Sequence, residues 1–343
     1  MKKNTLKKLM ALACAGAMSL SLAACGGSNS NETPSSGSEG GAAESVKIGV
    51  LQFAPHPSLD NCYEGIIEGL AEAGYVDGEN GVTIEFQNAN GSTSDGDMMA
   101  KTMASSCDML IAIATPAAMS CYAAAKDDGI PVIYSAVSDP LAAGLAKDLE
   151  NPQTGASGTK DALNLEGQMQ MIRALLPEAD TIGILYTTSE PNSVSHLQMF
   201  QELAPNYGFT IEAVGITNES EVASGAASLV AKGVDCVNNF TDNNVVNNLS
   251  TLLHATDAAG IPVFGSEEEQ VRNGCVAAES LDYVALGVET GLMAASVLSG
   301  EADIMSLPVS VVADTTPVYS AANLEKFSIT LPEAYSDATN LDE

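Results

Sequence analysis

The sequence predicts an α/β protein with two similar lobes, each built on a parallel sheet. Three observations predict this fold. Short apolar runs rich in β-branched residues alternate along the chain with segments of helical periodicity. Most of these runs are apolar on both faces, as in parallel strands that helices cover on each side. The order of strand, helix and turn then repeats in the second half of the chain, which indicates two lobes of the same kind.

The first 24 residues have the pattern of an export signal. Four lysines in the first eight residues precede an apolar run from Leu9 to Leu22 that ends in small residues. In the segment Leu22–Gly26, a cysteine directly follows Leu-Ala-Ala, which is where the bacterial lipoprotein pathway attaches diacylglycerol and cleaves. We therefore expect residues 1–24 to be a lipoprotein signal peptide, with Cys25 anchoring the mature protein at the extracytoplasmic face of the cell membrane.

Two alternatives to this interpretation remain. The leader could be a plain signal peptide followed by an incidental cysteine, since the charge and the small residues are the same in both cases. A transmembrane helix is a weaker alternative, because about 14 apolar residues are too few for a span that needs about 20. Residues 25–45 are almost wholly Gly, Ser, Asn, Glu and Ala, which predicts a flexible stalk, although a simple disordered N-terminus has the same composition.

The remaining residues, 46–343, are numerous enough for two lobes with separate cores and a cleft. Removing the leader takes away four lysines, so nine basic residues face 44 acidic ones, a formal charge near −35. This charge repels phosphate backbones, so we expect no nucleic-acid partner.

Cysteine and histidine residues give no sign of metal or cofactor chemistry. The five cysteines after Cys25 are odd in number, lack any CxxC pair and lie in apolar segments, so we expect them to be buried. The three histidines are far apart and lack metal-binding spacing. We therefore expect no cofactor, no metal site and, without a nucleophile motif, no enzymatic activity.

The predicted elements follow one another in a regular βα order. Nine strands are predicted at 47–51, 82–87, 109–114, 131–135, 181–186, 210–214, 234–240, 262–265 and 276–278. Three apolar stripes predict helices, and their members are Leu59, Tyr63, Ile66, Ile67 and Leu70; Met169, Ile172, Leu175 and Leu176; and Val245, Leu249, Leu252 and Leu253. The segment Ile48–Leu51 recurs 134 residues later as Ile182–Leu185, and Gly129–Val132 recurs 131 residues later as Gly260–Val263. Generic α/β turn sequences are the alternative explanation of this recurrence.

Candidate ligand-binding residues come directly after the predicted strands, because doubly wound sheets bind ligands at the carboxyl ends of their strands. These candidates are Gln52, Pro57, Thr115, Pro116, Ala117, Ser138, Asp139, Ser189, Asn192, Ser193, Thr241, Asp242, Asn243, Ser266, Glu267 and Asp282. Thr115 and Asp242 also fit as helix caps, and a helix start can hold a ligand carboxylate without a side-chain cation.

The charged residues narrow the class of ligand. Only two arginines exist, Arg173 and Arg272, so strongly anionic ligands lack their usual bidentate partner. Aspartates at strand ends, namely Asp139, Asp242 and Asp282, could each receive an ammonium group. There is no Trp to provide a flat platform for sugars. A zwitterionic amino acid therefore fits these residues.

Several segments closely resemble the tryptophan/tyrosine-type family of ABC-transporter substrate-binding proteins. In the first half they are 49–52, 56–60, 112–118 and 136–140, and in the second half 181–186, 189–193, 241–243, 261–264, 281–283 and 286–287. The resemblance spans about residues 46–300. Departures from the family pattern are Ser138 in place of a common Thr, the acidic run Glu267–Glu269, and a tail after Asp314 without a Lys-rich ending.

The resemblance implies a type I periplasmic-binding-protein fold, with two Rossmann-like lobes, three chain crossings and a ligand held between the lobes. The crossings are expected near Gly158–Asp161, Ser280–Tyr283 and Asp303–Leu307. Lobe 1 would then comprise residues 46–160 and 282–303, and lobe 2 residues 161–281 and 304–343. The implied ligand is an aromatic amino acid (Trp, Tyr or Phe), which hinge closure would trap for delivery to an ABC permease and its ATPase.

Two alternatives to this function stay open at this point. The same fold could bind another solute, namely a nucleoside, a sugar or a branched-chain amino acid. It could also act as an extracellular sensor domain that reports its ligand to a membrane receptor.

Overall fold

The computed structural model describes residues 45–342, which belong to one compact unit. The predicted signal peptide, Cys25 and all but the last residue of the predicted stalk lie outside the described residues. In the described part, no helix combines the length and the apolar character that a membrane crossing requires.

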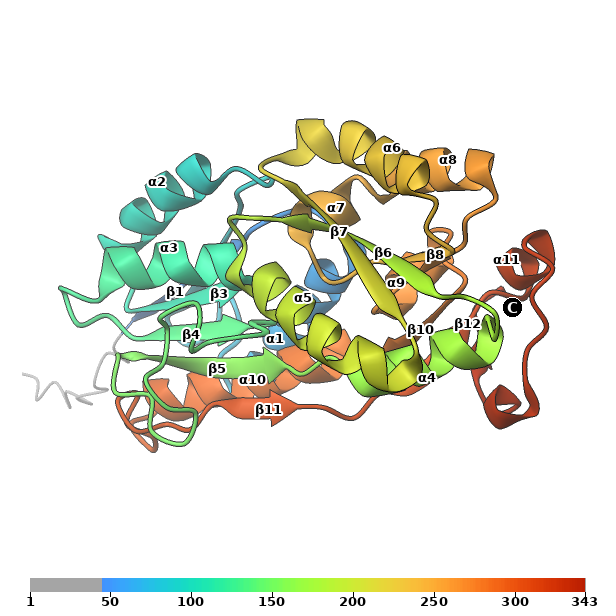
Figure 1. Cartoon of the computed structure of the whole chain (residues 1–343). Helices are drawn as coiled ribbons and strands as arrows, with labels where there is room; N and C mark the ends of the chain where they lie inside the picture. Colours follow the sequence, from blue (N-terminus) through green and yellow to red (C-terminus); the bar gives the residue numbers. More distant parts are fainter. Residues whose placement is uncertain (1–44, 343) are drawn as a thin grey trace, which may run out of the picture. The chain divides into compact units, whose positions relative to one another are not determined.

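Lobe 1 is built on a sheet of six parallel strands in the order β11-β5-β4-β3-β1-β2 (Figure 1). The strands are β1 (Val46–Gln52), β2 (Val82–Asn88), β3 (Met109–Ile113), β4 (Val132–Ser135), β5 (Ala156–Asp161) and β11 (Ser310–Val312). The central strand β3 is buried throughout, because helices cover the sheet on both faces. Its helices are α1 (Pro57–Glu72), α2 (Thr93–Ala104), α3 (Thr115–Ala125) and α10 (Tyr283–Leu298).

Helices α1 and α10 pack unusually close together, because each presents two glycines four residues apart to the other. A Cβ added at Gly65 would lie 2.1 Å from the carbonyl oxygen of Val284, and one at Gly287 would lie 2.3 Å from that of Cys62. The same holds for Gly69 and Gly291 one turn further along. Two backbones can approach this closely only where no side chain stands between them.

Lobe 2 has a parallel sheet of four strands in the order β7-β6-β8-β9 and a smaller sheet in the order β10-β12-β13. The strands are β6 (Thr181–Thr187), β7 (Thr210–Ile216), β8 (Cys236–Asn238), β9 (Val263–Phe264), β10 (Ala277–Ser280), β12 (Thr316–Tyr319) and β13 (Thr339–Asn340). Strand β10 runs antiparallel to β12, which is parallel to β13. Backbone hydrogen bonds from Val276 to Val263 and from Gly265 to Ala277 connect the two sheets.

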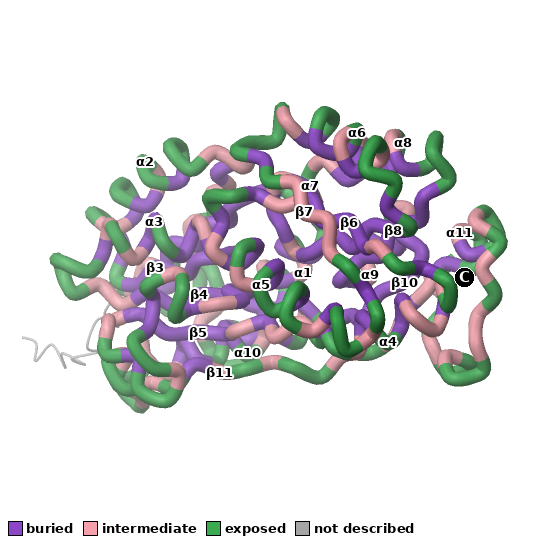
Figure 2. Tube along the Cα trace, in the orientation of Figure 1, coloured by how far each residue is buried: buried purple, intermediate pink, exposed green. Residues whose placement is uncertain are grey.

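The helices of lobe 2 flank these sheets (Figure 1). They are α4 (Leu165–Leu175), α5 (Pro191–Leu203), α6 (Val222–Lys232), α7 (Asn243–Asn247), α8 (Leu249–Ala259), α9 (Glu268–Arg272) and α11 (Ala321–Lys326), with short 3₁₀ turns at Ala204–Tyr207, Glu219–Glu221 and Glu333–Tyr335. Apolar side chains of the sheets and helices form one large buried cluster in lobe 1 and two in lobe 2. Figure 2 shows that burial follows the strands and the inner sides of the helices.

All nine predicted strands are present, and the α/β fold with parallel sheets is confirmed. The stripe from Val245 to Leu253 is divided between two helices, α7 and α8, because the chain leaves helical geometry at Asn248. Strands β5, β11, β12 and β13 were not predicted. Strand β5 carries Gly158, Thr159, Lys160 and Asp161, so it lacks the apolar run by which the other strands were recognised. The five predicted buried cysteines are buried, and all are free thiols.

The chain passes between the lobes three times. Strand β5 leads to α4, strand β10 leads to α10, and strand β11 leads to β12. The third crossing was expected at Asp303–Leu307 but lies at residues 313–315, because β11 pairs with β5 and so belongs to the sheet of lobe 1. Residues 304–312 were therefore wrongly placed in lobe 2, and β5 including Asp161 also pairs within lobe 1. The short, half-exposed β11 gives no sequence pattern that would have revealed this pairing.

Candidate ligand-binding site

The ends of the parallel strands of both lobes meet at a small buried chamber with a cavity volume of about 20 Å³, so a ligand larger than water enters only when the lobes move apart. Lobe 1 contributes His56, Leu59, Ala114, Thr115, Ala136, Ser138, Asp161 and Tyr283, and lobe 2 contributes Asn192, Thr241, Asn243 and Glu267. These residues lie where ligands bind in open parallel sheets, outside the carboxyl ends of the strands. The chamber is thus the place at which one small molecule could contact both lobes.

Lobe 1 builds its side of the chamber with a strained backbone. Ala114, directly after β3, has φ +78° and ψ 154°, and Ala136, directly after β4, has φ +55°. Such angles are rare for residues that carry a Cβ, and strain of this kind concentrates at functional sites. The turn at Ala114 starts α3 at the chamber wall, where Ala114 and Thr115 line the chamber. The first N–H groups of a helix have no partner within the helix, although Pro116 contributes none. This end of the helix favours an anion such as a ligand carboxylate.

Lobe 2 builds its side with a buried polar network centred on Glu190. One oxygen of Glu190, Oε2, accepts hydrogen bonds from the side-chain amides of Asn192 (3.1 Å) and Asn243 (2.7 Å) and from the backbone N–H of Asn243 (3.2 Å). The amide nitrogen of Asn192 is therefore engaged within lobe 2, since it also donates to the backbone carbonyl of Thr241 at 3.3 Å. Its carbonyl oxygen Oδ1 has no partner among the described residues and remains available to a ligand donor.

Asp242 lies behind this network and does not line the chamber. Its carboxylate accepts hydrogen bonds from the backbone N–H of Thr187 (2.5 Å), the hydroxyl of Thr187 (2.8 Å) and the backbone N–H of Val245 (3.1 Å). The last of these makes Asp242 the cap of α7. Its geometry favours the capping role over direct contact with a ligand ammonium.

Several polar atoms at the chamber are buried and unpaired among the described residues. They are His56 Nδ1, Asp161 Oδ1, Asn192 Oδ1, Thr241 Oγ1 and Glu267 Oε2. Burying a polar group without a hydrogen bond costs about 1–3 kcal/mol of folding free energy, so five such atoms around one cavity destabilise the ligand-free protein. A ligand with matching donors would satisfy them.

Burial changes the protonation of the groups around the chamber. Removal from water raises the pKa of Asp161 to about 6, of Glu267 to about 7 and of Glu190 to about 8, and it raises that of Asp242 as well. The same cause lowers the pKa of His56 to about 4, so its ring is neutral at physiological pH. The chamber therefore offers acidic and neutral groups to a ligand and no histidine cation.

One hydrogen bond joins the lobes beside the chamber. The hydroxyl of Ser195 on α5 donates to the carboxylate of Asp139 in the loop after β4, at 2.6 Å. Asp139 also accepts from the backbone N–H of Ala142 at 2.9 Å, which fixes its own loop. This contact holds the lobes in the arrangement described here.

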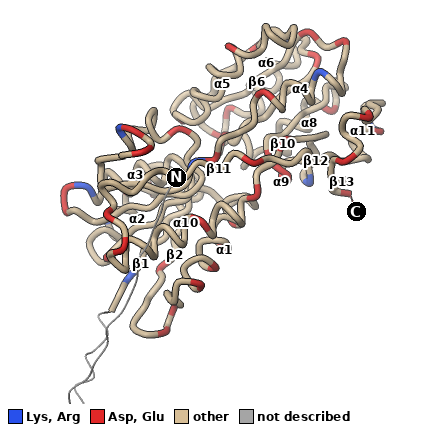
Figure 3. Tube along the Cα trace, turned by 90° about the horizontal axis from the view of Figure 1, so that it is seen from below, with Lys and Arg blue, Asp and Glu red and all other residues tan. Residues whose placement is uncertain are grey.

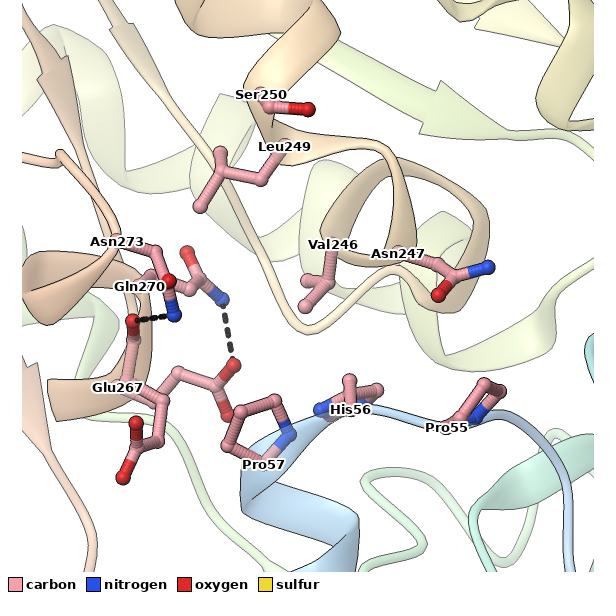
Figure 4. Close-up of a pocket in the computed structure, with 11 residues that line it drawn as sticks. Pro55, His56, Pro57, Val246, Asn247, Leu249, Ser250, Glu267, Gln270 and Asn273 are labelled. Atoms are coloured by element: carbon pink, nitrogen blue, oxygen red, sulfur yellow. Dashed lines mark hydrogen bonds between the residues drawn. The ribbon is translucent and has the colours of Figure 1, made fainter.

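A second space, of about 250 Å³, opens beside the chamber (Figure 4). Pro55, His56 and Pro57 face α7, α8 and α9 across it, and its polar lining includes Gln270, which donates to Glu267 at 3.1 Å. This groove is larger, but its only buried unpaired atoms belong to His56 and Glu267, which it shares with the chamber. The chamber is therefore the stronger candidate for ligand recognition, and the groove opens beside it.

The structure brings six of the predicted site residues together at the chamber, namely Thr115, Ser138, Asn192, Thr241, Asn243 and Glu267. Pro57 lines the groove, and Asp282 lines a third, separate hollow while capping α10. The remaining candidates lie outside the chamber lining, and these are Gln52, Pro116, Ala117, Asp139, Ser189, Ser193, Asp242 and Ser266.

Six chamber residues were not predicted, namely His56, Leu59, Ala114, Ala136, Asp161 and Tyr283. Asp161 was missed because β5 was not recognised as a strand, and so its end was not searched. Tyr283 and Leu59 belong to α10 and α1, whose first turns reach the chamber. His56, in the loop after the first predicted strand, and Ala136, directly after the predicted strand 131–135, carried the same sequence signal and could have been found.

Comparison with known protein families identifies the chain. Residues 47–340 match the family model described as ABC transporter substrate binding protein. The chain belongs to this family. Because the family binds substrates for ABC transporters, the expectation of a binding protein rather than an enzyme is confirmed.

Several relatives have similar sequence identity to this chain, but their solved structures match it to different degrees. A tyrosine-binding protein of Clostridioides difficile (strain R20291) is 34% identical over 93% of this chain and 92% of its own. A Streptococcus pneumoniae ABC domain in complex with L-Trp is 36% identical, with a TM-score of 0.82 over 86% of this chain and 98% of the other. A ligand-free, open substrate-binding protein of Clostridium difficile is 35% identical, with a TM-score of 0.65 over 86% and 99%. The lobes described here are thus arranged more like those of the L-Trp complex than those of the open protein.

Proposed function

We propose that this protein binds an aromatic amino acid, tyrosine, tryptophan or phenylalanine, in the chamber between its lobes and delivers it to an ABC permease. The observation that carries the proposal is the chamber itself, where a helix start in lobe 1 faces unpaired acceptor oxygens from both lobes. An amino acid carries a carboxylate for the first and an ammonium for the second. The tyrosine-binding and L-Trp-bound relatives support the aromatic side chain.

The apolar part of the chamber supports an aromatic side chain rather than a sugar. Leu59, the ring of Tyr283 and the neutral ring of His56 line it together with Ala114 and Ala136. Flat rings and small methyl groups suit a planar aromatic group, whereas a sugar needs many paired hydroxyl partners. Nucleosides, sugars and branched-chain amino acids remain the competing ligands that an experiment should include.

A thermal-shift and calorimetric screen tests the proposal. The purified protein should show a higher melting temperature with tyrosine, tryptophan or phenylalanine, because a ligand that binds the folded state alone stabilises it. Leucine, valine, nucleosides and sugars at the same concentration serve as controls. A shift with a nucleoside or sugar, and none with the three aromatic amino acids, would contradict the aromatic assignment.

We further propose that Cys25 carries a lipid that holds the protein at the extracytoplasmic face of the membrane, near its permease and ATPase. The lysine-rich leader and the Leu22–Gly26 segment support this placement. Mass spectrometry of the membrane fraction should find a lipid-modified N-terminus at Cys25. The Cys25→Ala variant should lose the modification, and a wild-type protein without lipid at this residue would overturn the anchor.

A further inference from the structure

Two buried carboxyl groups reach the chamber from opposite lobes. Asp161 is the last residue of β5 in lobe 1 and is 2% exposed, and Glu267 precedes α9 in lobe 2 and is 1% exposed. Each has one oxygen held by a neighbour, since Tyr283 donates to Asp161 Oδ2 at 3.3 Å and Gln270 donates to Glu267 Oε1 at 3.1 Å. The other oxygen of each, Asp161 Oδ1 and Glu267 Oε2, has no partner within hydrogen-bond geometry among residues 45–342. The hydroxyls of Ser138 and Ser58 are near enough to lower the pKa of Asp161 and of Glu267, respectively, but burial outweighs them.

No ion pair of the described part of the chain neutralises either carboxyl group. The four ion pairs there all join partly exposed side chains that do not line the chamber. Lys160 is adjacent to Asp161 in sequence, but its ammonium donates to the backbone carbonyl of Ser138. The charge of Lys160 lowers the pKa of Asp161, but burial outweighs it and the pKa remains raised. The other titratable groups that act on the pair are Tyr283, Cys62, Glu269 and Cys275, together with His56 in the chamber lining, and none of these supplies a cation at neutral pH.

Closing the lobes therefore brings two carboxyl groups into one buried cavity. Two carboxylates in such a site repel each other, and each loses its hydration, so they remain ionised only if a cation lies between them. Because ionisation is unfavourable there, the pKa of Asp161 is raised to about 6 and that of Glu267 to about 7. The negative charge of Asp161 also contributes to the raised pKa of Glu267. A proton or a ligand cation can remove this cost.

We propose that Asp161 and Glu267 jointly receive the ligand ammonium group and thereby make closure of the lobes conditional on a cation. This inference rests on the proposed function, because it assigns one end of the amino acid within the same chamber. An ammonium has three donors, enough for Asp161 Oδ1, Glu267 Oε2 and one further acceptor such as Asn192 Oδ1. The ligand carboxylate then faces the start of α3 in lobe 1.

The pair is a specificity determinant, because it distinguishes amino acids from the same molecules without the amino group. At pH 8 such a molecule leaves two buried carboxylates unpaired and should bind poorly. At pH 5.5 the carboxyl groups of the pair are largely protonated and no longer need the ligand ammonium. The difference in affinity between molecules with and without the amino group should therefore become smaller. Asp242 and Glu190 do not share this role, because neither lines the chamber; Asp242 holds backbone N–H groups of lobe 2, and Oε2 of Glu190 holds the amides of Asn192 and Asn243.

Calorimetric titration with L-tyrosine and with 3-(4-hydroxyphenyl)propionate, which lacks only the amino group, tests the proposal at pH 8 and pH 5.5. In the wild-type protein, the preference for tyrosine should fall about tenfold or more between pH 8 and pH 5.5. In Glu267→Gln and in Asp161→Asn, the preference at pH 8 should fall by about 10- to 100-fold, the amount that a charge-assisted hydrogen bond contributes. The adjacent, half-exposed Glu268→Gln should behave as wild type.

The outcomes separate this inference from the proposed function. If the wild type binds tyrosine but both variants keep its preference for the amino group, the pair does not receive the ammonium, and the proposed function stands. A change in only one variant overturns the shared role. If one variant fails to fold, an unchanged wild-type preference at both pH values still overturns the proposal. If tyrosine, tryptophan and phenylalanine all fail to bind the wild type, the proposed function and this inference fall together.

Discussion

Lobe 1 and lobe 2 place the same elements around the chamber but hold them there in different ways. Lobe 1 relies on backbone geometry, with two glycine-faced helices in direct contact and two alanines at positive φ where β3 and β4 end. Lobe 2 relies on buried polar side chains, chiefly Glu190 and Asp242, which hold the amides and helix starts that line the chamber. Added side-chain atoms should therefore destabilise lobe 1 most, and added buried charge should destabilise lobe 2 most.

Figure 3 adds a contrast between the surface and the chamber. Acidic residues are spread along the trace of both lobes, and basic residues are few. These surface charges are solvated and mainly keep the protein soluble. The acids of the chamber differ because burial makes their ionisation costly, as the raised pKa values of Glu190 and Glu267 show.

The largest expected effect is at the glycine contact of lobe 1. In Gly287→Ala, the new methyl group would meet the carbonyl oxygen of Cys62 at 2.3 Å, so α1 and α10 must move apart. We expect the free energy of unfolding to fall by about 3 kcal/mol, at the upper end for overpacking. Urea unfolding measures this change through the midpoint.

A helix glycine of lobe 2 provides the control. In Gly225→Ala on α6, the methyl group would meet the end of the Leu185 side chain at 2.4 Å, which can turn aside. The loss there should be about 1 kcal/mol or less, since alanine also favours the helix. Equal losses at both positions would contradict the idea that lobe 1 depends on direct backbone contact.

The second-largest expected effect is a pH dependence of stability that arises from a buried acid of lobe 2. Burial raises the pKa of Glu190 to about 8, so between pH 6.5 and 8 the folded protein holds a proton that the unfolded chain has already lost. Stability should therefore fall as pH rises through this range, by about 1–2 kcal/mol for this one group. Below pH 6.5 the buried His56 and His196 act in the opposite direction, because their pKa values are lowered to about 4 and 3.

Denaturant titration of the ligand-free protein at pH 6.5 and pH 8 checks this sign. Glu190→Gln should remove much of the fall, because glutamine stays neutral and its oxygen can still accept from Asn192 and Asn243. The exposed Glu202→Gln on the same helix should leave the fall unchanged. Stability that rises between pH 6.5 and 8 would refute the assignment.

A smaller effect, of opposite sign, is expected from relieving strain in lobe 1. Ala114 has φ +78° and ψ 154°, a region that glycine occupies without a clash. Ala114→Gly should therefore stabilise the protein by about 1 kcal/mol in urea unfolding. Ala117→Gly in the first turn of the same helix should destabilise it by about 1 kcal/mol, and a loss at both positions would argue against strain at Ala114.

The smallest effect concerns the contact that joins the two lobes. Ser195→Ala removes the hydrogen bond to Asp139, which the lobes make only when they are close together. We expect ligand affinity to fall several-fold, corresponding to about 0.5–1 kcal/mol, because Asp139 is only half-buried and water can replace the bond. Ser224→Ala, whose hydroxyl contacts only its own helix turn, is the calorimetric control, and equal losses would exclude an inter-lobe role.

The sequence by itself determined the α/β class, nine of the strands and half of the chamber residues. Apolar runs such as Met109–Ile113 identify a buried strand without any knowledge of its neighbours, because burial on both faces requires apolar side chains. Thr115, Asn192 and Glu267 could then be found by counting from a strand end, because ligands of parallel sheets bind there.

Only the tertiary structure decided which acids face the ligand. Asp161 ends a strand and Asp242 follows one, so the two are alike in sequence. The carboxylate oxygens of Asp242 accept hydrogen bonds from Thr187 and Val245, whereas one oxygen of Asp161 has no partner at the chamber among the described residues. The pairing of β11 with β5, the approach of Gly65 to Gly287 and the meeting of Asp161 with Glu267 were likewise invisible in sequence. Each joins residues about 100 or more positions apart, and local periodicity carries no information about such distant neighbours.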